Sequence, residues 1–158
     1  MTPCFLPNLS LLTSAPTAMN CQNWSATDSG LWHGEGMDVK NLDSAVPFTT
    51  KDGSEIRELL AHRNSAIRKQ SLAEARLEPG SSTQEHYHVK TEEIYYITHG
   101  VGRIRIDGEV RDVTVGDAIA ILPGQRHKLW NTGPDVLRLL CCCAPCYENE
   151  DTVMTEGE

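Results

Sequence analysis

The sequence lacks both an apolar run long enough to cross a membrane as a helix and an excess of basic residues. No stretch of about 18 consecutive apolar residues occurs in the chain. Lysine and arginine number 14 against 22 aspartate and glutamate residues, which gives a formal net charge of -8. Phosphate backbones are bound through clustered positive charge. We therefore expect neither nucleic acid nor a membrane among the partners of this protein.

The N-terminal part also lacks the features of a secretion signal. Residues 4–18 are mildly apolar, but no basic residue precedes them, and Pro7 and Asn8 interrupt the apolar stretch. A disulfide framework is missing as well, because four of the six cysteines crowd into residues 141–146, where strand neighbours point to opposite faces. We expect a cytoplasmic protein that uses cysteine as a small apolar residue. Cys143-x-x-Cys146 leaves a redox or zinc site as the alternative.

The 158 residues suit one domain with two flanking segments. Residues 1–36 are rich in Ser, Thr, Pro, Asn and Gly without periodicity, and we interpret them as a disordered or loosely attached extension. The folded domain is expected over residues 37–148. Residues 149–158 are expected to form an acidic tail that is extended.

From residue 45 onward, short alternating segments are separated by turn residues. Residues 101–106 lead through Asp107-Gly108 into residues 109–115, and Asp-Gly accepts the positive φ angles of a tight hairpin turn. No convincing helical pattern lies between the segments, so the series predicts an all-β sandwich or barrel. The expected strands cover residues 67–77, 83–88, 93–98, 101–106, 109–115, 118–122, 126–131 and 136–143, with residues 54–60 as a strand or a single helical turn.

Four side chains in this region have the chemistry of a metal site. His86 and His88 are two residues apart, which places both imidazoles on one face of a strand. Glu93 begins the next segment, and His127 begins a later one. Imidazole nitrogen combined with a carboxylate oxygen suits a divalent transition metal such as Fe, Mn, Zn or Ni. Four protein ligands leave up to two positions of an octahedral ion for substrate, water or oxygen.

At these residues the chain resembles the cupin superfamily. The first cupin motif, G-x5-H-x-H-x4-E-x6-G, is matched by Gly80, His86, His88, Glu93 and Gly100. The second, G-x5-P-x-G-x2-H-x3-N, is matched by Gly116, Gly124, His127 and Asn131, with Leu122 where the family has proline. The resemblance covers residues 45–148 and implies a cupin jelly-roll β-barrel, or double-stranded β-helix, with the metal inside one mouth. The chain also looks like the short cupins labelled mannose-6-phosphate isomerase-like.

Strand alternation predicts which other side chains lie beside the metal. Gln84 shares a face with His86 and His88, and Tyr95 shares a face with Glu93. A glutamine and a tyrosine hydroxyl would orient a polar substrate or a bound water. For Tyr95 the alternative is a core aromatic whose hydroxyl bonds to the backbone.

Two classes of function follow from this site. The first is a metal-dependent enzyme acting on a small oxygenated metabolite, either a sugar or sugar-phosphate isomerase or a dioxygenase or lyase. The second is a non-catalytic sensor or sugar-binding module. A homodimer is expected, because a barrel of this size has exposed strand edges through which two copies can pair.

Overall fold

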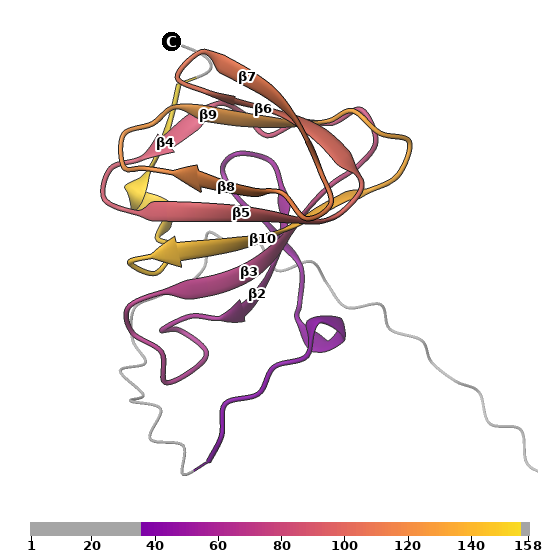
Figure 1. Ribbon diagram of the computed structural model, residues 1–158. Helices are drawn as coiled ribbons and strands as arrows, with labels where there is room; N and C mark the ends of the chain where they lie inside the picture. The colour runs from indigo at the N-terminus through magenta and orange to yellow at the C-terminus, as the bar shows by residue number, and fades with distance from the viewer. Residues whose placement is uncertain (1–35, 156–158) are drawn as a thin grey trace, which may run out of the picture.

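The computed structural model describes residues 36–155, which form two antiparallel sheets packed face to face (Figure 1). One sheet has the strand order β1-β2-β3-β10-β5-β8 and the other β11-β4-β9-β6-β7. The strands are β1 (Phe48–Thr49), β2 (Glu55–Leu60), β3 (Ser71–Leu77), β4 (His86–His88), β5 (Glu92–His99), β6 (Val101–Ile106), β7 (Glu109–Thr114), β8 (Ala118–Ile121), β9 (His127–Asn131), β10 (Leu137–Ala144) and β11 (Thr152–Met154). The predicted all-β fold is confirmed.

Helical structure in the described residues is limited to two short 3-10 turns. These are η2 (Leu42–Ser44) and η3 (Asn149–Asp151). Within residues 36–155, no helix has the length and apolar character needed to cross a membrane.

Alternation along the strands places one row of side chains between the sheets. In β5, Glu93, Tyr95 and Ile97 are buried, whereas the residues between them are exposed. In β10 the inward row is Leu137, Leu139, Cys141 and Cys143. Except for Glu93 and Cys143, the residues of these two rows pack with Ile121 and Leu129 in one apolar core. Apolar burial of this kind contributes on the order of 25 cal/mol per Å² to folding. The buried polar residues His86, His88, Glu93 and His127 lie outside this apolar cluster.

The hairpin between β6 and β7 forms as the sequence predicts. Asp107 and Gly108 adopt φ angles of 47° and 91°, and Ile106 pairs with Glu109 across the turn. Two consecutive positive φ angles match the right-handed twist of the flanking strands.

Two strands begin later than the alternation indicates. The strand expected from Ile67 begins at Ser71, because its pairing with β10 ends at the Ser71–Cys143 pair. The Arg68 guanidinium there donates to the carbonyl oxygens of Ser65 and Ile67, which folds the chain locally. The strand expected from Thr83 begins at His86, because the Gln84 N–H donates to the Asp52 carbonyl instead of to a neighbouring strand.

The C-terminal segment departs from the expected tail. Within residues 149–158, β11 pairs with β4 and aligns Thr152 with His88 and Met154 with His86. This strand lies at the edge of the sheet that carries the histidines (Figure 1). Residues 152–154 therefore join the sheet beyond the domain end predicted at residue 148, whereas the predicted N-terminal extension lies outside the described residues apart from Gly36.

Candidate metal centre

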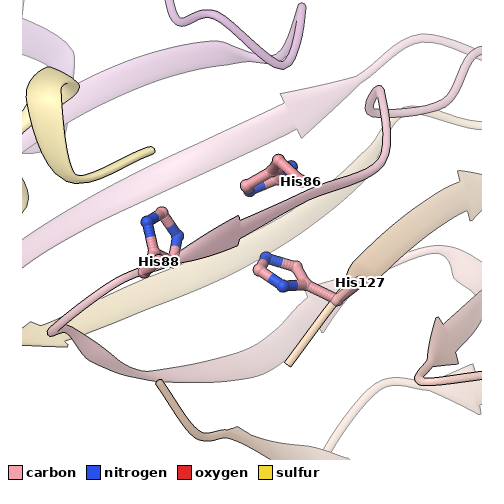
Figure 2. Close-up of side chains that lie close together, drawn as sticks. All are labelled: His86, His88 and His127. Carbon is pink, nitrogen blue, oxygen red and sulfur yellow. The ribbon is translucent and has the colours of Figure 1, made fainter. Parts of the chain in front are cut away.

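Three histidines from two neighbouring strands lie together between the sheets. His86 and His88 alternate to the same face of β4, and His86 pairs directly with His127 on β9. Their ligand nitrogens all lie within 4.8 Å of one another. Figure 2 shows the two β4 rings and the β9 ring gathered in one place. All three side chains are buried, and His127 has no exposed surface.

Glu93 reaches the same cluster from β5 of the opposite sheet. Its Oε2 atom lies 3.2 Å from His88 Nε2 and 3.6 Å from His127 Nε2. The other carboxylate oxygen accepts a hydrogen bond from the Cys143 thiol at 3.3 Å. The structure thus brings together all four residues that the sequence nominated, with three imidazoles on one sheet and a carboxylate facing them.

Backbone carbonyls select the tautomer of two of the histidines. His86 Nδ1 donates to the Gln84 carbonyl at 2.8 Å, and His127 Nδ1 donates to the Gln125 carbonyl at 3.0 Å. Because each proton is held at Nδ1, the Nε2 atom presents a lone pair. Hydrogen bonds of this type, made by the ring nitrogen that does not bind the metal, orient metal-binding histidines. His88 Nδ1 lies 3.3 Å from the Thr152 hydroxyl of β11, which supplies the corresponding partner.

Burial and neighbouring charges set the protonation states in the cluster. Burial lowers the pKa of His127 to about 4, and the His86 imidazole acts in the same direction. Burial opposes ionisation of Glu93, but the neighbouring His88 and His127 side chains and the Cys143 thiol favour the ionised form more strongly. The pKa of that carboxyl therefore lies below its usual value. A neutral imidazole and an ionised carboxylate are the forms that ligate a metal.

One atom of the cluster tests whether a cation fits. Among the described residues, His127 Nε2 is completely buried and has no hydrogen-bond partner. A buried nitrogen lone pair without a partner carries a desolvation penalty of roughly 1–3 kcal/mol. A divalent ion beside three imidazole nitrogens and a carboxylate would satisfy it. The donor set also matches the preferences of Zn, Fe, Mn and Ni ions.

A cavity opens beside the cluster, with a volume of about 50 Å³. His86, His88 and Glu93 line it, and so does Tyr95 as the alternation predicted. Burial raises the pKa of Tyr95 well above its usual value, and the Glu93 charge adds to this, so the phenol keeps its proton and can donate a hydrogen bond. Within residues 36–155, no lysine or arginine lines this cavity.

Gln84 does not take the place that the sequence predicted for it. Its side chain is exposed and lies outside the cavity wall. The alternation of side chains along β4 does not include Gln84, because the chain is not a strand before His86. Gln84 contributes through its carbonyl oxygen, which holds the His86 ring, and not through its amide.

Three other residues of the cavity wall were missed by the sequence reasoning. Tyr147 and Thr152 come from the C-terminal segment, and Asp52 comes from the turn between β1 and β2. In the C-terminal segment, the β-branched pair Thr152-Val153 is the one sequence feature that indicates a strand. No local sequence pattern places Asp52 beside the histidines, because only the folding of the chain brings these distant residues together.

The second motif departs from the family pattern at Leu122 without harm to the site. Leu122 is exposed in a turn whose ends are joined by a hydrogen bond from Gln125 N to the Leu122 carbonyl. Gly124 adopts a φ of 82° and donates its N–H to the His88 carbonyl at 2.7 Å. The turn therefore still connects β8 to the β4 strand that carries two of the histidines.

Fold and site together define a small double-stranded β-helix protein with a buried cluster of three histidines. The cupin domain model matches residues 73–143, a segment that contains the three histidines and Glu93. An uncharacterized protein of Methanocaldococcus jannaschii is 47% identical over 114 residues, which cover 72% of this chain and 91% of that protein. The chain belongs to the cupin superfamily.

Two further similarities come from Thermotoga maritima. A protein described as oxalate-binding is 33% identical over 86 residues, which cover 54% of this chain and 71% of that protein. The crystal structure of a predicted oxalate decarboxylase aligns with a TM-score of 0.61 and 26% identity, over 68% of this chain and 98% of that one.

Proposed function

We propose that this protein is a metal-dependent enzyme that acts on a small oxygenated metabolite. His86, His88, Glu93 and His127 would hold one divalent transition metal. The observation that carries the proposal is the convergence of three imidazoles, each with a ring nitrogen within 4.8 Å of those of the other two. Hydrogen bonds at Nδ1 of His86 and His127 support it, because they leave the ligand nitrogens unprotonated.

The bound metal would supply Lewis acidity to a ligand that coordinates through its oxygens. The protein's own part is to position that ligand and exclude water. Tyr95 offers a protonated hydroxyl in the cavity wall, and the apolar side chains of Leu129 and Leu139 lie beside it. A cavity of about 50 Å³ favours a compact ligand.

The composition of the wall favours dioxygenase or lyase chemistry over a sugar-phosphate isomerase. A phosphate group is normally bound by arginine, lysine or backbone N–H groups, and among the described residues no cationic side chain reaches the cavity. The similarity to a predicted oxalate decarboxylase supports a ligand that chelates a metal through two oxygens.

The second candidate function is ligand binding without turnover. It is supported by the 33% identical relative that is described as oxalate-binding. One simple measurement distinguishes ligand binding from catalysis. A binder is stabilised thermally by its ligand and leaves the ligand unchanged, whereas an enzyme consumes it.

Metal content measured by elemental mass spectrometry tests the proposal. The wild type should carry close to one transition-metal ion per chain, and a His86→Ala/His88→Ala variant should lose it. His99→Ala is the matched control, because His99 is exposed and lies outside the cluster. Iron or manganese would direct substrate screens to oxygen and lyase chemistry, and zinc or nickel to isomerases and hydrolysis. A wild type that takes up no metal even after reconstitution would overturn the proposal.

A further inference from the structure

The cavity beside the histidines is also lined by two acidic residues that the metal cluster does not use, Asp52 and Glu58, of which Glu58 pairs with Arg63. Asp52 lies in the turn between β1 and β2 and is 7% exposed. It lines the same cavity as His86, His88 and Glu93. Its backbone carbonyl accepts the Gln84 N–H at 2.7 Å, which ties the turn to the start of β4. Its position is therefore fixed relative to the histidines.

The hydrogen bonds of Asp52 occupy only one of its two carboxylate oxygens. Oδ1 accepts from the Thr50 hydroxyl at 2.6 Å, from the Ser54 N–H at 3.1 Å and from the Ser54 hydroxyl at 2.8 Å. In the part of the chain described, no hydrogen bond reaches Oδ2, and no lysine or arginine pairs with the carboxylate. Three donors on one oxygen orient the group and leave the other oxygen for a ligand.

A role in the turn accounts for only part of this arrangement. The bond from Ser54 N–H to Oδ1 is an Asx-type contact that asparagine could make equally well. A buried carboxylate without a cation is stabilised by hydrogen-bond donors, and among the described residues these donors reach Oδ1 alone. Tyr95 and Tyr147 line the same cavity as Asp52. Asp52 therefore lies in a part of the cavity wall that also offers aromatic hydroxyls.

We propose that Asp52 accepts a hydrogen bond from a hydroxyl group of the ligand, so that the site takes hydroxylated metabolites and rejects those with a second anionic group. The inference rests on the proposed metal centre, which would bind the chelating end of the ligand. At the other end, a hydroxyl satisfies Oδ2, whereas a phosphate or a second carboxylate meets a like charge that no lysine or arginine of the wall offsets.

A matched pair of ligands tests this selectivity. Glycerate and tartronate share a 2-hydroxycarboxylate that can chelate a metal, but glycerate ends in a CH2OH group where tartronate ends in a carboxylate. Protein loaded with one equivalent of Co²⁺ is titrated with each ligand by isothermal titration calorimetry. Relative to free Co²⁺ in the same buffer, wild-type protein should shift the preference toward glycerate by about tenfold or more, the size of a hydrogen bond to a charged group.

Asp52→Asn removes the charge and keeps an oxygen for the turn contacts. This variant should lose most of the shift toward glycerate, while Asp112→Asn, at an exposed position on β7, should retain it. The wild-type comparison needs no substitution, so it decides the question even if Asp52→Asn does not fold. A loaded wild type that binds neither ligand, or that prefers glycerate no more than free Co²⁺ does, would overturn the role of Asp52 and leave the metal centre intact. Failure to take up Co²⁺ would instead overturn the metal centre, and this inference with it.

Discussion

His88 differs from the other two histidines in what holds its ring. His86 and His127 donate to carbonyl oxygens two residues earlier in their own segments. His88 relies on the Thr152 hydroxyl, which is 64 residues away in the sequence. Thr152 Oγ1 also donates to the Glu148 carbonyl, which leaves it free to accept from His88 Nδ1. The orientation of one proposed ligand therefore depends on β11.

Thr152→Val should weaken metal binding while the fold is retained. Valine has the shape of threonine but cannot accept a hydrogen bond from the Nδ1–H group. His88 therefore loses the partner that sets its tautomer. Loss of such a partner lowers metal affinity by about 10- to 100-fold. Competition against a chromophoric chelator measures this. Thr152→Ser should restore the affinity, and Thr132→Val, at an exposed position, should not alter it. An unchanged affinity in Thr152→Val would show that the hydroxyl does not act on His88.

The proposed metal ligands could be predicted from the sequence, because the alternation of side chains along a strand is a local pattern. The residues that contact these ligands could not be predicted in this way. The spacing of His86 and His88 by two residues requires a shared face once both are on a strand. The same argument failed for Gln84, because the strand ends before it. Asp52, Tyr147 and Thr152 reach the cavity through a turn and a C-terminal strand that pair with distant parts of the chain. No pattern within a few residues contains that information.

At the scale of elements, β9 is the strand on which the site depends most. It carries His127 and lies between β4, which carries the other histidines, and β6. Gly102 of β6 lies opposite Asn131 of β9. A Cβ atom at Gly102 would lie 2.8 Å from the Trp130 carbonyl oxygen and 2.9 Å from Leu137 Cδ2. The two strands can approach this closely only because residue 102 is glycine.

Gly102→Ala should therefore destabilise the protein. The added methyl group meets backbone on one side and a fully buried leucine on the other, so β6 must move away from β9. Overpacking of this kind costs about 1–3 kcal/mol, which chemical denaturation of the metal-free protein can measure. Thr114→Ala, at an exposed position on the neighbouring strand β7, should change the free energy of unfolding by no more than about 0.5 kcal/mol. Equal stability of Gly102→Ala and wild type would mean that the strands have room to separate.

The strands themselves were predictable where alternation and turn chemistry agreed. Asp107-Gly108 and the segments on either side of it formed the expected hairpin. The β11 strand was missed, because a three-residue strand is too short to show a period and its acidic surroundings are typical of a solvated tail. Hydrogen bonds between the segment that contains β11 and other parts of the chain hold this strand in place. The Asp151 carboxylate accepts from the Lys90 and Thr91 N–H groups, and Lys51 donates to the Asn149 and Thr152 carbonyls.

At the scale of the whole molecule, each of the two sheets supplies part of the site. The sheet that contains β4 and β9 supplies the three imidazoles, and the other sheet supplies Glu93 and Tyr95. The cavity thus lies between layers, where burial strengthens electrostatic interactions. The homodimer expected from the exposed strand edges stays a prediction.

Anomalous X-ray diffraction from crystals of the metal-loaded protein tests the central claim most directly. A single anomalous peak should lie between the sheets, about 2.0–2.2 Å from Nε2 of His86, His88 and His127 and from a carboxylate oxygen of Glu93. The remaining positions around the ion should face the cavity that Tyr95 lines. A peak bound instead by the cysteines of residues 141–146, or a stoichiometrically loaded protein with no peak among the histidines, would contradict this account.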